Sequence, residues 1–152
     1  MTTVEGPHAP ATRANLVIRV LLALVFVPEG MKKFLFPDQW GAGRFARIGI
    51  PWPDLSAHFV GGVEILFGVL ILVGLFTSLA TIPLLVDMAV AIATTKIPLL
   101  WRATAVSSKT GFWSLQAESR TDLATFLCLV FLLWAGPGPF SLDARRKERA
   151  VA

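Results

Sequence analysis

The sequence predicts an all-α integral membrane protein that folds as a four-transmembrane-helix bundle. Two features of composition and one of pattern carry this prediction. Hydrophobic residues make up 55% of the 152 residues, charged residues only 16%, and the mean hydropathy is +0.67. An average soluble domain is about 45–50% apolar and about 25% charged. The apolar residues also form long runs, separated by segments rich in Pro, Gly and Trp. Lipid is therefore the better solvent for these runs.

The first span is expected at residues 15–36, after a polar N-terminal tail at residues 1–14. About 20 helical residues cross the hydrocarbon core. Arg19 can extend toward the headgroups at one end, and Lys32 and Lys33 at the other. Pro37 ends the helix.

The segment at residues 37–56, PDQWGAGRFARIGIPWPDLS, has a different composition from the spans. Its glycines and prolines disfavour a long helix. Trp40 and Trp52 flank Arg44 and Arg47, and aromatic residues together with basic residues are typical of the headgroup region. We expect an interfacial or partly re-entrant aromatic loop between the first two spans.

Three further spans are expected at about residues 57–76, 79–97 and 121–136, which gives a membrane domain over 15–140. The second span is rich in glycine, and small residues let helices approach closely in lipid. The turn at Thr77-Ser78 is so short that the second and third spans must be antiparallel neighbours. A basic C-terminal tail follows at residues 141–152.

Several function classes are disfavoured by the composition. Cys128 is the single cysteine, so an intrachain disulfide and paired-cysteine chemistry are excluded. The two histidines argue against a His-based metal site, and we expect no metal. Basic residues are spread between lipid-seeking segments, which argues against nucleic-acid binding. The sequence contains no hydrolytic triad, phosphate loop or nucleotide fingerprint.

Three acidic residues lie within the predicted spans: Glu29, Glu64 and Asp87. An ionisable group deep in a bilayer costs about 2.5–3.5 kcal/mol on insertion scales, so each should face a partner or a wet cavity. Glu29 has Lys32 and Lys33 one turn away. Glu64 has no cation on its own helix, so either it is protonated or its partner is Lys32, Lys33 or Arg120.

These acids are the candidate catalytic residues, because carboxylates in a membrane can accept and release protons. A pocket for a quinone or a lipid is the accompanying hypothesis. Its candidate residues are Lys33, Trp40, Trp52, His58 and Trp101. For the tryptophans the alternative is membrane anchoring. For His58 it is a helix cap or a hydrogen-bonding core residue.

Short motifs in a fixed order resemble the DoxX family of small bacterial membrane proteins. They are Glu29-Gly30-Met31-Lys32-Lys33-Phe34, Gly49-Ile50-Pro51 with Pro53, Gly61-Gly62-Val63-Glu64 with Gly68, Gly74-Leu75-Phe76-Thr77, and Gly136-Pro137-Gly138 with Ser141-Leu142-Asp143. The resemblance implies a four-helix membrane bundle and covers about residues 15–145. It also implies a link to redox systems. Members of the family include subunits linked to thiosulfate–quinone oxidoreduction, and relatives are associated with the maturation of redox enzymes and with thiol chemistry. The missing cysteine pair makes this chain depart from the thiol branch.

Three functions follow as hypotheses. The first is a membrane subunit of a redox system that interacts with quinone and anchors a soluble oxidoreductase. The second is a small transporter or ion-handling protein that uses the intramembrane carboxylates and forms a homo-oligomer. The third is a structural or assembly partner without its own activity. We expect a multi-pass protein of the bacterial inner membrane with both termini cytoplasmic, because the C-terminal tail is the densest basic cluster.

Overall fold

The computed structural model describes residues 14–104 and 107–151, and all regular structure within them is helical. Of the expected N-terminal tail, residues 1–13 lie outside the described residues. The elements, in chain order, are α1 (Ala14–Leu35), α2 (Pro37–Trp40), α3 (Ala42–Arg47), α4 (Pro53–Val73), α5 (Thr77–Ala91), the π-helical turn η1 (Ile92–Lys96), the 3-10 turn η2 (Ile97–Leu100), α6 (Phe112–Ala135) and α7 (Leu142–Val151).

Three helical stretches among the described residues are long and apolar enough to cross a membrane: Ala14–Leu35, Pro53–Val73 and Thr77–Leu100. The all-α prediction is therefore confirmed. The third stretch continues through η1 and η2 without leaving helical conformation. Helix α6 has 24 residues, but its first turns carry Glu118, Arg120 and Asp122. The fourth span stays a prediction.

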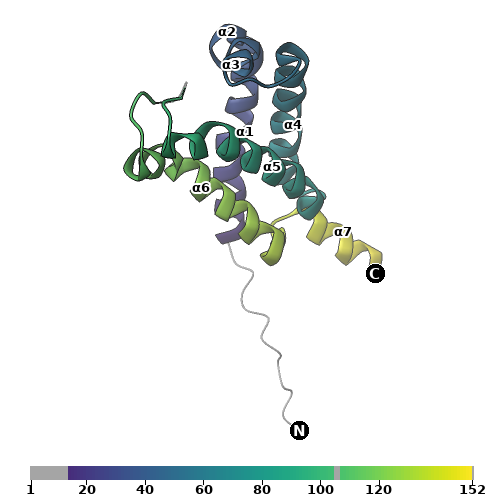
Figure 1. Cartoon of the computed structure of the whole chain (residues 1–152). Helices are drawn as coiled ribbons and strands as arrows, with labels where there is room; N and C mark the ends of the chain where they lie inside the picture. The colour runs from purple at the N-terminus through teal and green to yellow at the C-terminus, as the bar shows by residue number, and fades with distance from the viewer. Residues whose placement is uncertain (1–13, 105–106, 152) are drawn as a thin grey trace.

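Helices α1 and α4 form a close antiparallel pair (Figure 1). One stripe of α4 is buried, and its members are spaced three or four residues apart: Ala57, Gly61, Glu64, Gly68 and Ile71. At the crossing point Gly30 faces Gly61, where a Cβ added to Gly30 would lie 2.6 Å from the Gly61 carbonyl oxygen. Glycine is needed here because the two backbones touch.

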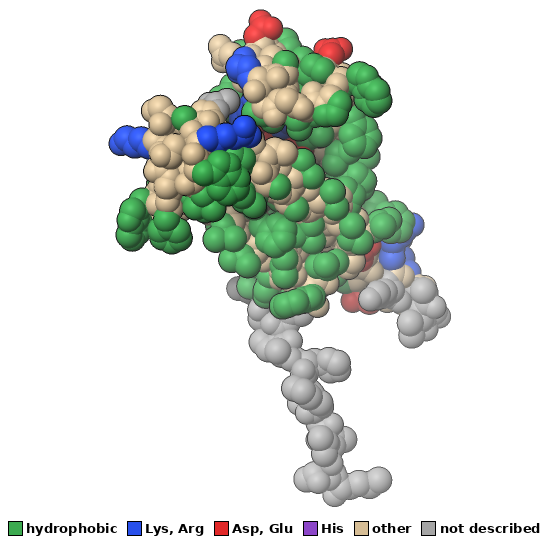
Figure 2. All heavy atoms as spheres, in the orientation of Figure 1, with side chains coloured by type: hydrophobic (Ala, Val, Ile, Leu, Met, Phe, Trp, Pro, Cys, Tyr) green, Lys and Arg blue, Asp and Glu red, His purple; other side chains and the backbone are tan. Residues whose placement is uncertain are grey.

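Helices α5 and α6 form a second pair, which crosses the first (Figure 1). Where the pairs meet, buried apolar side chains from four helices make the core: Leu22, Phe26, Ile71, Ala80, Leu84, Met88, Leu129 and Leu132. The outward faces remain apolar, and hydrophobic side chains cover much of the surface seen in Figure 2 between the charged groups at its two ends. This is the surface that a bilayer requires.

Arg19 is buried, which corrects the expectation that it extends to the headgroups. Only 1% of the residue is exposed. Its guanidinium donates to the carbonyls of Ile71 and Leu72 at the end of α4, and to those of Pro137 and Phe140 after α6. The last carbonyls of a helix have no partner within the helix and carry partial negative charge. The Arg19 guanidinium, which comes from α1, donates hydrogen bonds to these carbonyls at the end of α4 and also compensates their partial negative charge.

Asp143, at the start of α7, caps the N-terminus of α5. Its carboxylate oxygens accept hydrogen bonds from the backbone N–H groups of Phe76 (2.8 Å) and Thr77 (2.9 Å). The Asp143 N–H donates to the Gly74 carbonyl at 2.9 Å. Gly74 has φ +70, and a Cβ there would lie 2.7 Å from the Arg19 Cζ atom. The basic tail therefore begins as part of the packed structure.

Candidate functional site

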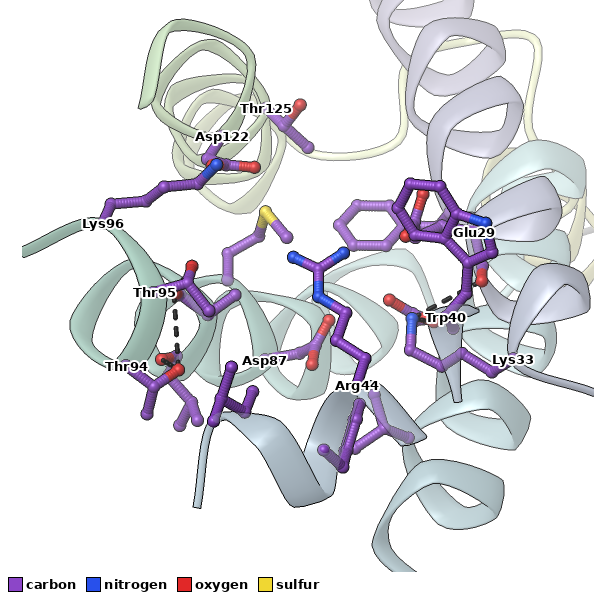
Figure 3. Close-up of a pocket in the computed structure, with 18 of the residues that line it drawn as sticks. Glu29, Lys33, Trp40, Arg44, Asp87, Thr94, Thr95, Lys96, Asp122 and Thr125 are labelled. Carbon is purple, nitrogen blue, oxygen red and sulfur yellow. Dashed lines mark hydrogen bonds and ion pairs between the residues drawn. The ribbon is translucent and has the colours of Figure 1, made fainter. Parts of the chain in front are cut away.

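A cavity of about 290 Å³ lies at the end of the bundle away from α7 (Figures 1 and 3). Helices α1, α4, α5 and α6 supply its walls, and α2 and α3 with the segment after them cover it. Its charged and polar lining residues are Glu29, Lys33, Trp40, Arg44, Glu64, Asp87, Thr94, Thr95, Lys96, Thr121, Asp122 and Thr125. The remaining lining residues are apolar, among them Phe26, Phe45 and Met88.

Lys33 and Glu64 form a buried ion pair in this cavity. The Lys33 Nζ donates to the Glu64 Oε2 at 2.5 Å, and the two side chains are 8% and 3% exposed. Lys33 comes one turn after Gly30 and Glu64 one turn after Gly61, so the close crossing of α1 and α4 brings them together. The prediction that Glu64 takes its partner from another helix is confirmed, with Lys33 as that partner.

Glu29 pairs with Lys32 on its own helix, at 2.6 Å between Oε2 and Nζ. Both side chains are about one-third exposed. The Lys32 Nζ also lies 4.4 Å from the centre of the Trp40 ring, a cation–π contact. Because the Glu29 carboxylate pairs with Lys32, the Lys33 ammonium can pair with Glu64.

Asp87 of α5 faces the same ion pair from across the cavity. Glu29 and the Lys33–Glu64 pair line the same cavity. The lining therefore places two further carboxyl groups, those of Asp87 and Glu29, in the cavity that holds the Lys33 ammonium. Two carboxylates near one ammonium can share and pass on a proton.

A second ion pair, which sequence reasoning missed, joins Lys96 of η1 to Asp122 of α6 at 3.2 Å. A lysine near the end of an apolar run usually lies at the membrane interface. The π-helical turn places Thr94, Thr95 and Lys96 in the cavity lining, and such turns are frequent at functional sites. The Thr94 and Thr95 hydroxyls donate to the Val90 and Ala91 carbonyls in this turn. The detectable signal was Asp122 at the boundary of an apolar run.

Arg44 was also missed, because the sequence placed it at the headgroups. It enters the cavity from α3, beside the buried Phe45 (Figure 3). The Arg44 Cζ atom lies 5.5 Å from the centre of the Trp40 ring. A short helix over a cavity is hard to anticipate in a segment with three glycines and three prolines.

Of the eight predicted site residues, Glu29, Glu64, Asp87, Lys33 and Trp40 line the cavity, whereas Trp52, His58 and Trp101 do not. Trp52 is 78% exposed and Trp101 65%. The His58 ring hydrogen-bonds the Asp54 carbonyl at 2.7 Å and packs edge-on against Phe34. Within the described residues, no group of three His, Cys, Asp or Glu side chains has the arrangement of a metal site.

Comparison with known proteins agrees with this architecture. The family model DoxX matches residues 14–97. The chain belongs to the DoxX family. It is 48% identical over 145 residues to the uncharacterized membrane protein Rv3486 of Mycobacterium tuberculosis, an alignment that covers 95% of this chain and 88% of that protein. No solved structure matches. The matched DoxX region includes Glu29, Lys33, Arg44, Glu64 and Asp87.

Proposed function

We propose that this DoxX protein is a membrane subunit of a redox system and binds a quinone ring in the cavity. The observation that carries the proposal is the acidic pair Glu64 and Asp87 beside Lys33, within a cavity between membrane helices. Ligand pockets are mostly apolar with a few convergent polar groups. This cavity combines apolar side chains, among them Phe26, Phe45 and Met88, with charged groups that converge on it. The volume is enough for a single ring system.

The acidic pair supplies the proton chemistry of this proposal. Reduction of a quinone to a quinol takes up two electrons and two protons. The electrons come from the soluble oxidoreductase that the subunit anchors, and the two protons come from water. The Glu64 and Asp87 carboxylates take up these protons and pass them to the ring oxygens, after which the Lys33 ammonium, 2.5 Å from Glu64, again stabilises the ionised Glu64 carboxylate.

The location of the site follows from the same proposal. The protein lies in the bacterial inner membrane with α6 as the fourth span and both termini cytoplasmic. The start of α1 and helix α7 lie at the same end of the structure, which supports an even number of crossings (Figure 1). The cavity then faces the opposite side of the bilayer, beneath α2 and α3.

Native mass spectrometry of the protein, gently extracted from its own membrane, tests the ligand. We expect a bound quinone in the wild type and less of it in Glu64→Gln and Asp87→Asn. The matched control is Asp54→Asn, because the Asp54 side chain is 83% exposed and Asp54 does not line the cavity. Phospholipid alone in every sample would contradict the proposal.

A proton- or ion-conducting role is the second candidate. Its support is the presence of two ion pairs in one cavity, Lys33–Glu64 and Lys96–Asp122, with the Glu29 carboxylate in the same lining. Liposome flux distinguishes this role. Flux that is lost in Glu64→Gln without any quinone would favour it, and equal flux in empty vesicles would exclude it.

A further inference from the structure

The Arg44 guanidinium lies in the cavity without a protein acceptor. Across residues 14–104 and 107–151, it takes part in no hydrogen bond or ion pair. The two lysines of the lining each form an ion pair, Lys33 with Glu64 at 2.5 Å and Lys96 with Asp122 at 3.2 Å. Arg44 is therefore the cation in the described lining that is left for a ligand.

The other arginine of α3, Arg47, does find protein acceptors for its guanidinium. The Arg47 guanidinium donates to the carbonyls of Asp38 and Gln39 at 3.1 and 3.3 Å, on the exposed side of α3. Arg44, one turn earlier, points instead into the cavity, beside Trp40 (Figure 3). A half-buried guanidinium without hydrogen bonds is costly, and a bound acceptor would remove that cost.

The groups on the two sides of the cavity indicate which class of ligand would carry the acceptor for Arg44. On one side, Arg44 offers a planar fork of N–H donors beside the flat face of Trp40, with its Cζ 5.5 Å from the ring centre. On the other side, Glu64 and Asp87 offer carboxyl groups. A flat ring with an oxygen acceptor at each of two opposite positions matches both sides.

We propose that Arg44 donates hydrogen bonds to one carbonyl oxygen of a quinone ring that packs against Trp40, with the opposite oxygen toward the acidic pair. This inference rests on the proposed function and assigns its ligand-recognition residue. It separates oxygen recognition by Arg44 from proton transfer by Glu64 and Asp87. Loss of Arg44 thus weakens binding of the carbonyl-bearing ring and leaves apolar ring binding unchanged.

The test uses two probes that share one skeleton: menadione, which has two ring carbonyls, and 2-methylnaphthalene, which has none. Equilibrium dialysis of the full-length protein in detergent, against protein-free micelles, gives the affinity for each. The variants are Arg44→Gln, Arg44→Lys and the matched control Arg47→Gln, which makes the same charge change on the other side of α3.

We expect the wild type and Arg47→Gln to bind menadione more tightly than 2-methylnaphthalene. Arg44→Gln should weaken menadione binding about 10- to 100-fold, the effect of losing a hydrogen bond to a charged group, and should remove the preference. Arg44→Lys should restore part of it. Thermal unfolding of each variant in the same detergent shows that the protein remains folded.

Two outcomes would overturn the inference, and they differ in what they mean for the proposed function. Equal menadione affinity in wild type and Arg44→Gln would show that Arg44 does not recognise the ring, while quinone binding would stand. No menadione retention by the wild type above that of empty micelles would contradict quinone binding itself, and with it the assignment of Arg44.

Discussion

At the scale of single residues, several charged side chains are buried, and each of them contacts a specific partner. Lys33 and Glu64 are almost completely buried and touch at 2.5 Å, and Arg19 is buried among backbone carbonyls. Removing one member of a buried ion pair leaves the other uncompensated, which costs more than replacing both. Mutational tests of such residues must therefore separate lost function from lost stability.

The ion pair predicts strong coupling between Lys33 and Glu64. Lys33→Met and Glu64→Gln should each lower the free energy of unfolding by about 3–5 kcal/mol, the usual cost of an unpaired buried charge. The double variant should lose less than the sum of the two. Unfolding by SDS in mixed micelles, arranged as a double-mutant cycle, measures the coupling. Additive losses would mean that the two side chains do not interact.

Asp143 predicts a stability change at acid pH. Burial alone raises the pKa of Asp143, but hydrogen bonds from the Thr77 and Phe76 N–H groups outweigh it and bring the pKa below its ordinary value. A lowered folded-state pKa means that this carboxylate stabilises the fold above the unfolded pKa of about 3.9. The contribution is lost as pH falls through the folded-state pKa.

The measurement is the difference in unfolding free energy between wild type and Asp143→Asn, followed across pH. It should be constant above about pH 5 and shrink below about pH 4, because the protonated aspartate can no longer accept both hydrogen bonds. Asp54→Asn serves as the control at an exposed carboxylate. A difference that is the same at every pH would contradict the capping role.

At the scale of helices, the contact between α1 and α4 positions the candidate site. The spacing of glycines in the second span correctly predicted a tightly packed helix. It did not tell Gly61, which is buried against α1, from Gly62, which has open space around its Cα. Adjacent helical residues face directions about 100° apart, so only the orientation of the helix assigns them.

Two glycine substitutions should therefore have opposite effects. Gly30→Ala places a Cβ 2.6 Å from the Gly61 carbonyl and 2.8 Å from Ile65, so α1 and α4 must separate. We expect a loss of about 1–3 kcal/mol, typical of overpacking. Gly62→Ala meets nothing within 4 Å and should gain up to about 1 kcal/mol from helix propensity.

SDS unfolding of both variants checks this prediction, and quinone retention provides a second measurement. Because the helix crossing places Lys33 against Glu64, Gly30→Ala should also lower ligand retention, while Gly62→Ala should not. Equal stability of the two variants would show that the helices have room at the crossing.

The sequence predicted the helices well and the site in part. Acidic residues in apolar runs identified Glu29, Glu64 and Asp87, because a membrane makes such charges conspicuous. Arg44 and Lys96 could not be recognised, since basic residues near the ends of spans normally lie at the headgroups. The fold of residues 37–47 and the π-helical turn bring them inward, and both depend on tertiary contacts.

At the scale of the whole molecule, the two crossing helix pairs are tied together at one end. Asn15 at the start of α1 donates to the Gly136 carbonyl after α6 at 2.9 Å. The first and last long helices are thereby tied at one end, and the cavity lies at the other. This arrangement makes a definite prediction about which parts of the chain share a side of the membrane.

Thiol labelling in intact cells can test that topology. With Cys128 replaced by Ala, we expect Trp52→Cys and Ser107→Cys to react with a membrane-impermeant reagent from outside. Arg149→Cys in α7 should react only after the membrane is opened. The single native cysteine makes the background simple to remove. Labelling of Ser107→Cys and Arg149→Cys from the same side would rule out α6 as a membrane span.

The contacts of Arg19 and Asp143 also bear on the order in which the protein matures during synthesis. Arg19 lies near the start of α1, yet two of its carbonyl partners and the cap of α5 lie beyond residue 136. While the ribosome is still making α6, the Arg19 guanidinium and the Phe76 and Thr77 N–H groups lack these partners. The packing can therefore be completed only after α6 and the first residues of α7 have been synthesised. A nascent chain stalled before residue 143 should accordingly be more sensitive to membrane proteases than the released protein.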